Sequence, residues 1–209
     1  GPDLERVYLY DLDITADGRR RIVVKKSNFS AIKNMGDVNM RHAGRYGLAL
    51  PYIRPGSRIL DFPCGSGLAL EVFSDLARFG SFFYEGWDSD EPTIIYAREI
   101  YGKGRPWVRF DVRDLANFEL NPGTFDTICC IEGIEHIDPN SQVKACAQFA
   151  RGLASRGTLI VSSPSPETES SNPNPQNPFH VWELTKSDLL ELLGRNFGPE
   201  NVELISQKN

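Results

Sequence analysis

The stretch Arg58-Ile-Leu-Asp61-Phe-Pro-Cys64-Gly-Ser-Gly67-Leu68 decides the fold that we predict for this chain. Residues 58–60 follow a Pro-Gly turn and are typical of a short buried strand, which Asp61 closes. A tight turn with two glycines comes next, and residues 68–79 then show the apolar periodicity of a helix. A strand, a glycine turn and a helix form the first half of a nucleotide-binding βαβ unit, where the free N–H groups of the helix N-terminus can meet a ligand.

The glycine turn differs from the dinucleotide fingerprint, which requires the pattern G-x-G-x-x-G. Gly65 and Gly67 supply the first two glycines, but the next glycine is Gly80. An acidic residue that ends a strand before such a turn resembles motif I of the class I S-adenosylmethionine-dependent methyltransferases. That motif usually has a further glycine where this chain has Pro63, which removes one backbone N–H and fixes φ. The alternative is a glycine turn that serves only the packing of helix on strand.

Composition sets the bounds for this interpretation. The 209 residues suit one domain with a sizeable core, and 40% hydrophobic with 24% charged residues indicates a soluble globular protein. The net charge of −5 does not favour a general polyanion-binding surface. No apolar run is long enough to span a bilayer, and no secretory signal is evident, so we expect a cytoplasmic protein. The four cysteines form no C-x-x-C pair, which favours free thiols.

Residues 1–54 are predicted to form an annex ahead of a core domain at residues 55–209. Gly1-Pro2 resembles a protease-cleavage scar and is left out of the fold prediction. Loose alternation at residues 6–10 and 21–24, with Asp17-Gly18 between them, predicts a β-hairpin. Its basic residues form either a solvated strand face or a patch for a substrate phosphate. A mainly helical segment should follow over residues 29–53.

Strands and helices alternate through the rest of the chain. Strands are expected at residues 82–87, 107–110, 125–131 and 157–162, with helices at 91–101 and 142–153. This alternation predicts an α/β fold with a doubly wound, mostly parallel sheet, whose ligands lie at the carboxyl ends of the strands. A last helix should begin at Thr185 or Ser187 and end at Leu193, before a final strand at 202–205. A seventh strand is not evident, which indicates a truncated chain or a modified fold.

An acidic residue ends four of the predicted strands. By the resemblance, Asp88 accepts hydrogen bonds from both ribose hydroxyls of S-adenosylmethionine, while Asp111 binds the adenine amino group and Val112 packs on the ring. Arg45, shortly before motif I, would meet the methionine carboxylate. The alternatives are loop or capping roles for the acids and a surface position for the arginine. The residues expected to bind the cofactor are Arg45, Tyr46, Asp61, Phe62, Cys64, Gly65, Gly67, Asp88, Ser89, Asp111, Val112 and Glu132.

The segment Glu132-Gly-Ile-Glu135-His136 follows the fourth strand of the core. In a first helical turn, positions i, i+3 and i+4 share one face, so two carboxylates and an imidazole can bind a divalent cation there. The pattern E-x-x-E-H resembles the metal site of ubiquinone-biosynthesis O-methyltransferases, and that of small-RNA 3′-terminal 2′-O-methyltransferases, which add a later histidine. His180 is the candidate for this fourth ligand. Such donors do not select between Mg²⁺, Mn²⁺, Fe²⁺ and Zn²⁺.

The alternative is a metal-free site, in which Glu132 contacts the cofactor region and His136 is either a lone general base or a cap of the turn. His180 would then be a loop anchor or a substrate contact. Residues 163–178, rich in Ser, Pro and Asn, are expected to form a lid over the acceptor pocket. We therefore expect methyl transfer from S-adenosylmethionine to the oxygen of a small molecule, such as a sugar, a natural product or a cell-envelope intermediate. An RNA 2′-O-methyltransferase, which the acidic pI disfavours, and a non-catalytic cofactor-binding subunit are the alternatives. The sequence does not indicate the oligomeric state.

Overall fold

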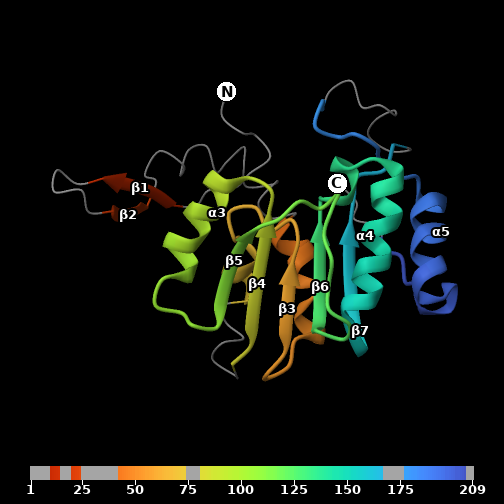
Figure 1. Ribbon diagram of the computed structural model, residues 1–209, viewed down its shortest axis with the longest axis horizontal. Coiled ribbons are helices and arrows are strands. Elements are labelled where there is room, and N and C mark those ends of the chain that lie inside the picture. The colour runs from red at the N-terminus through yellow and green to blue at the C-terminus, as the bar shows by residue number, and fades with distance from the viewer. Residues whose placement is uncertain (1–9, 15–19, 25–41, 74–80, 167–176, 206–209) are drawn as a thin grey trace.

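The computed structural model describes residues 10–14, 20–24, 42–73, 81–166 and 177–205. Within them, five strands form one sheet in which all neighbours run parallel. The chain enters this sheet in the middle, moves outward over two strands and then returns to the other side of the first (Figure 1). The predicted doubly wound parallel sheet is therefore confirmed. In spatial order the strands are β5 (Val108–Val112), β4 (Phe83–Asp88), β3 (Arg58–Asp61), β6 (Phe125–Ile131) and β7 (Leu153–Ser162).

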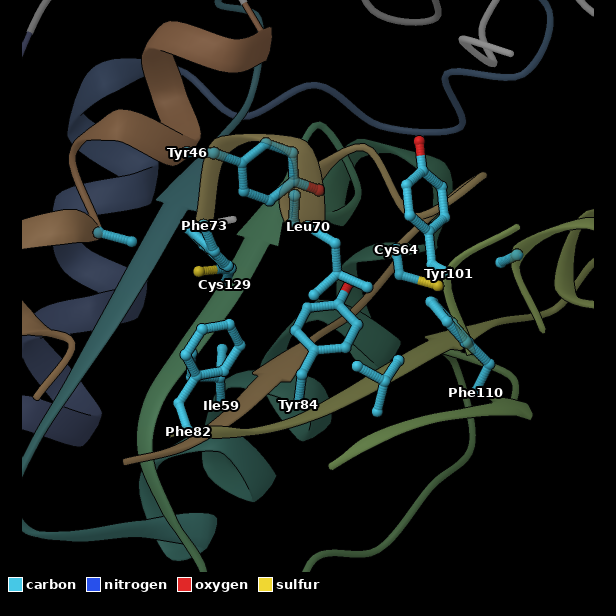
Figure 2. Close-up of a cluster of buried hydrophobic side chains, with 14 of the residues drawn as sticks. Tyr46, Ile59, Cys64, Leu70, Phe73, Phe82, Tyr84, Tyr101, Phe110 and Cys129 are labelled. Carbon is cyan, nitrogen blue, oxygen red and sulfur yellow. The ribbon is translucent and has the colours of Figure 1, made fainter. Parts of the chain in front are cut away.

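Two apolar clusters lie on opposite faces of the sheet. Successive residues of a strand face opposite sides of the sheet, so Ile59 belongs to one cluster and Leu60 to the other. The first cluster is drawn in Figure 2, where the side chains of β3, β4 and the glycine turn meet those of the helices above them. The helices of the first cluster are 42–47, α2 (Ala69–Phe73) and α3 (Glu91–Ala97), and those of the second are α4 (Pro139–Gly152) and α5 (Lys186–Phe197).

Several element limits differ from the prediction. α4 begins at Pro139 and not at residue 142, and β7 begins at Leu153 and not at residue 157. Thr185 is the residue that caps α5, because its side chain accepts a hydrogen bond from the Asp188 N–H, and the helix continues past Leu193 to Phe197. The helix expected at 91–101 is divided into α3 and a π-helical turn. The described part of α2 ends at Phe73. The remaining short turns are η1 (Leu50–Tyr52), the π-helical η3 (Arg98–Gly102), η4 (Ile134–His136) and η5 (Pro199–Asn201).

The N-terminal hairpin is confirmed as an antiparallel pair. Its strands are β1 (Tyr10–Ile14) and β2 (Arg20–Val24), with Tyr10 opposite Val24. The alternation at residues 21–24 coincides with β2, and the described part of the first strand begins at Tyr10, the last residue of the alternating stretch 6–10. The predicted turn at 17–18, most of the helical segment and residues 167–176 of the expected lid lie outside the described residues. The lid and the division into an annex and a core stay predictions.

The predicted strand at 202–205 is wrong. These residues follow η5 without strand structure, and none of the described strands pairs with them. Alternating apolar side chains favour a strand only where a neighbour offers its backbone groups. Across the described part of the chain, no helix is both long and apolar enough to cross a membrane.

Candidate functional site

The glycine turn after β3 is fastened to the carboxyl end of β4. Gly65 and Gly67 both have positive φ, at 51° and 90°. A Cβ atom on Gly67 would lie 2.8 Å from the ring of Tyr101, so both backbone angle and space require glycine. The Gly65 N–H donates to the Asp88 carboxylate at 3.0 Å, and the second oxygen of Asp88 accepts from the Asp90 N–H at 3.0 Å. The structure thus brings the turn and the predicted ribose-binding acid together.

A second carboxylate, that of Asp61, is enclosed in the first apolar cluster. Its exposed fraction is 0%, and its two oxygens accept hydrogen bonds from the hydroxyls of Tyr46 and Tyr84. Burial raises the pKa of Asp61 to about 7, the two hydroxyl bonds act against this rise, and the Asp88 carboxylate adds to it. The two tyrosine hydroxyls therefore stabilise the charged form of the Asp61 carboxyl group.

Glu132, the first residue after β6, takes a backbone conformation that residues other than glycine rarely adopt. Its φ is 49°, and among the described residues it is the one non-glycine residue with positive φ. Ser162, at the end of β7, donates its hydroxyl to the Glu132 carboxylate at 2.7 Å and accepts the Glu132 N–H through its carbonyl at 3.1 Å. Arg45 pairs with the other carboxylate oxygen at 3.4 Å. Partners from two other elements thus hold this strained turn at the sheet edge.

The helix of Arg45 also brings His42 to this edge. Burial lowers the pKa of His42, the Glu132 carboxylate raises it and the Arg45 guanidinium lowers it. These interactions place the imidazole within electrostatic reach of the Glu132 turn. With His136 and His180, all three histidines of the chain therefore lie around the end of β6.

Glu135, His136 and His180 form a cluster in which the atoms able to ligate a metal all lie within 4.8 Å of one another. The two imidazole rings meet edge to face, with centroids 5.1 Å apart. Glu132 is not part of this cluster, because the short helix η4 begins only at Ile134. The expectation that one helical turn presents Glu132 together with the other two side chains is therefore wrong.

The Glu135 side chain is fully buried, and neither carboxylate oxygen has a hydrogen-bond partner among the described residues. Burial raises the pKa of Glu135 well above its usual range, and the Glu132 carboxylate raises it further. The Ser163 hydroxyl lies close enough to lower this pKa, but it donates to the carbonyl of Pro164. A buried carboxyl group without a hydrogen bond is costly, so a proton or a cation is needed there.

Both imidazoles of the cluster are oriented through Nδ1. His136 Nδ1 lies 2.9 Å from the carbonyl of Phe179, and His180 Nδ1 lies 2.6 Å from a carboxylate oxygen of the buried Glu183. A neutral imidazole that donates its Nδ1–H to an oxygen presents Nε2 as its basic or ligating nitrogen. The two rings are thus set to act through Nε2.

Residues 177–184 are attached to the turn after β6 by a backbone hydrogen bond and through the side chain of Gln142. The Trp182 N–H donates to the Glu135 carbonyl at 3.0 Å. Gln142, buried in α4, donates its amide to the carbonyls of Ile134 and Trp182 at 3.0 and 2.8 Å. Sequence reasoning missed Gln142, because nothing in a helical pattern marks one inward amide as a link between two loops. For Glu183, the spacing of three residues from His180 is a signal that could have predicted its contact with the imidazole.

The remaining predicted cofactor residues lie near the same edge. Asp88 and Val112 are opposite each other in the register of β4 and β5, and Val112 is 41% exposed. The Asp111 carboxylate pairs with Arg109 at 2.7 Å and with Arg98 at 3.6 Å. The predicted contact of Asp111 with adenine would therefore compete with two guanidinium groups. Of the other three residues predicted to bind the cofactor, Phe62 and Cys64 are buried and Ser89 is exposed.

Comparisons with known proteins agree with this fold. Residues 59–157 match the family model described as a methyltransferase domain. The chain is 33% identical over 141 residues to a Mycolicibacterium smegmatis protein named "Probable S-adenosylmethionine-dependent methyltransferase", which covers 66% of this chain and 50% of that protein. It is 35% identical over 101 residues to the ubiquinone biosynthesis O-methyltransferase of Neisseria meningitidis, which covers 46% of this chain and 40% of the relative. The chain thus spans half or less of the length of these curated relatives.

Solved structures share the fold. A SAM-dependent methyltransferase from Archaeoglobus fulgidus matches with a TM-score of 0.64 at 20% identity, over 81% of this chain and 73% of that one. The YcgJ protein of Bacillus subtilis matches with a TM-score of 0.61 at 22% identity, over 74% of this chain and 68% of that one. Identities this low support the arrangement of the elements and nothing finer.

Proposed function

The chain belongs to the class I S-adenosylmethionine-dependent methyltransferases, and from this premise we propose that it methylates a hydroxyl group of a small molecule. The observation that carries the proposal is the cluster of Glu135 and His136, which follow β6, with His180 from the loop before α5, at the same end of the sheet as the glycine turn after β3. One part of this edge suits the cofactor, and the neighbouring part offers groups that can take up a proton.

The cofactor half consists of the glycine turn and the acids at the ends of β4 and β5. Asp88 orients the turn through the Gly65 N–H, and its carboxylate oxygens can also accept hydrogen bonds from ribose hydroxyls. Val112, exposed beside it in the register, offers an apolar surface for the adenine ring. The Arg45 guanidinium suits the methionine carboxylate, which would replace Glu132 as its partner.

The acceptor half consists of the cluster and the loop around His180. A sulfonium is an activated methyl donor, so the protein has to align the acceptor oxygen with the methyl carbon and remove the proton of the hydroxyl. His136 is oriented by the Phe179 carbonyl so that Nε2 can receive this proton. His180, oriented by Glu183, faces the same space and can bind the acceptor oxygen.

The cluster also suits a divalent cation. The buried carboxylate of Glu135 and the imidazoles of His136 and His180 are the residues that would hold it, each imidazole with an oxygen partner on Nδ1 as is usual for metal-bound histidines. A bound cation would lower the pKa of the acceptor hydroxyl. The buried carboxyl group without a hydrogen-bond partner among the described residues is the observation that favours this arrangement.

The loop beside the cluster presents apolar side chains outward. Phe179, Val181 and Trp182 are 63%, 47% and 40% exposed, although the loop backbone is hydrogen-bonded to η4 and α4. Large apolar side chains kept exposed on a fixed loop favour a binding surface. Together with the ubiquinone biosynthesis names of several relatives, they favour an acceptor with an apolar part next to its hydroxyl.

The test begins with binding and continues with turnover. Thermal shift should show stabilisation by S-adenosylmethionine and S-adenosylhomocysteine, with NAD as the control that has no effect. A panel of phenols, sugars and short RNAs is then assayed for transfer of a labelled methyl group, before and after exhaustive chelation. Transfer to a small hydroxyl compound supports the proposal. Transfer to RNA alone, or binding without transfer to any acceptor, would point to one of the two alternatives.

A further inference from the structure

Two neighbouring residues of helix 42–47 reach two different strand ends. Arg45 pairs with Glu132 at the end of β6, and Tyr46 donates its hydroxyl to Asp61 at the end of β3. β3 and β6 are adjacent in the sheet, so this helix crosses the switch point where the strand order reverses. The helix therefore connects the cofactor half of the edge to the acceptor half.

The Tyr46 hydroxyl makes its hydrogen bond to the Asp61 carboxylate inside an apolar cluster. Figure 2 shows the Tyr46 and Tyr84 rings among apolar side chains such as Leu70 and Phe73. Within that cluster, the Tyr46 hydroxyl lies 3.0 and 3.2 Å from the two oxygens of Asp61, and the Tyr84 hydroxyl lies 2.7 Å from one of them. A buried carboxylate needs such donors, because its desolvation is otherwise uncompensated.

The two tyrosines differ in what their bonds can hold in place. Tyr84 lies within β4, where backbone pairing with β3 and β5 already fixes it. Tyr46 lies on a short helix, and its ring otherwise makes an edge-to-face contact with Phe73 at 6.0 Å. Apolar contacts tolerate rotation and sliding, whereas a hydrogen bond to a charged group is directional. The hydroxyl of Tyr46 is thus the contact that can fix the rotation of this helix.

Rotation of the helix decides where Arg45 points. Consecutive residues of an α-helix are separated by a fixed angle of about 100°, which follows from 3.6 residues per turn. If Tyr46 is fixed against Asp61, the direction of the Arg45 side chain is fixed as well. The structure has Arg45 at 3.4 Å from Glu132, with both side chains 20% exposed. The guanidinium is thus held at the edge of the site and remains accessible to a ligand carboxylate.

We propose that Tyr46 is a positioning residue, whose hydroxyl bond to Asp61 orients helix 42–47 and so holds Arg45 at the site for the cofactor carboxylate. This rests on the proposed function, since it assumes that S-adenosylmethionine binds at this edge. In this arrangement Asp61 contacts two tyrosines rather than the cofactor. Tyr84 shares the same carboxylate and has no positioning role.

Two matched variants, Tyr46→Phe and Tyr84→Phe, test the proposal. Each removes one hydroxyl from the same buried carboxylate, so we expect similar losses in resistance to urea. By calorimetry, Tyr46→Phe should weaken S-adenosylmethionine binding about tenfold, because a misplaced Arg45 loses a charge-assisted bond, and Tyr84→Phe should change it by less than about threefold. Equal effects of the two variants on binding would overturn the positioning role.

A double-mutant cycle with Arg45→Ala separates positioning from packing. If Tyr46 acts through Arg45, then Tyr46→Phe should have little further effect on binding once the guanidinium is gone, and additive effects would overturn the proposal. Should Tyr46→Phe not fold, Asp61→Asn takes its place in a second cycle with Arg45→Ala, because a neutral amide accepts a weaker hydrogen bond from the Tyr46 hydroxyl than a carboxylate does. If the wild-type protein binds the cofactor and both cycles are additive, the proposed function stands and the positioning role of Tyr46 is rejected. A wild-type protein that does not bind S-adenosylmethionine loses both.

Discussion

Replacing Asp61 by asparagine should change how the stability of the protein depends on pH. The pKa of Asp61 is raised to about 7 in the folded protein, against 3.8 for the unperturbed group. Between these values the folded protein holds a proton that the unfolded chain has lost, so stability must fall as pH rises through this window. The Asp61→Asn variant lacks this contribution, because an amide does not titrate.

The size of the effect follows from the two pKa values. A difference of about 3 between them corresponds to roughly 4 kcal/mol over the full window, of which about 2.5 kcal/mol falls between pH 5 and pH 8. The pKa of Glu135 is also raised, and its effect on the pH dependence of stability is the same in wild type and variant. The difference in unfolding free energy between the two proteins therefore isolates Asp61. It should move by about 2.5 kcal/mol in favour of Asp61→Asn as pH rises from 5 to 8.

Urea unfolding followed by tryptophan fluorescence, at four pH values in this range, measures this difference. The slopes of free energy against urea should agree between the two proteins, which shows that the folded states expose similar surface. A difference in unfolding free energy that stays constant from pH 5 to pH 8 would refute the reasoning. It would mean that Asp61 keeps its charge throughout, and that the two tyrosine hydroxyls outweigh the cost of burial.

Other predictions concern the site itself. Asp88→Ala should weaken S-adenosylmethionine binding roughly ten- to a hundredfold in calorimetry, because a charged acceptor of hydrogen bonds is lost, and unchanged affinity would remove Asp88 from the cofactor site. If a cation is bound, Glu135→Ala and His136→Ala should reduce turnover to a similar extent and added cation should restore chelated enzyme, whereas a much milder Glu135→Ala with full activity after chelation would leave His136 as the base. Trp182→Ala should raise KM for an apolar acceptor about tenfold at unchanged cofactor affinity, and the same loss for a sugar acceptor would argue against an apolar contact.

The buried strands of the core were the most predictable part of the fold. β6 has the predicted limits, 125–131, and its residues from Thr127 to Ile131 are all buried, as expected of a strand covered on both faces. β5 is the outermost strand of the sheet and ends later than predicted, at Val112. Its last residues pair with β4 although they are polar or exposed. Pairing rather than composition sets such limits. Of the predicted row of acids, Asp61 and Asp88 end their strands, whereas Asp111 precedes the last residue of β5 and Glu132 follows β6.

The conformation of the Glu132 turn was beyond prediction from local sequence. The E-x-x-E-H pattern suggested a helical turn, whereas Glu132 takes a positive φ even though a glycine follows it. The side chains that hold it are Ser162, thirty positions further on, and Arg45, which precedes the whole core. Such partners become neighbours only through the crossover connections of the sheet, so no local pattern contains them.

The different roles of the strand-end acids follow from the alternation of side chains along a strand. Asp61 has the same parity as Ile59 and therefore faces the first apolar cluster, where Tyr84, the register partner of Ile59, and Tyr46 of helix 42–47 meet it. Asp111 has the same parity as Arg109, so it faces the opposite side of the sheet, where the two side chains pair. A strand limit that is correct to one residue is enough to place an acid at the edge. The direction in which its carboxylate points depends in addition on which residues pair across the sheet.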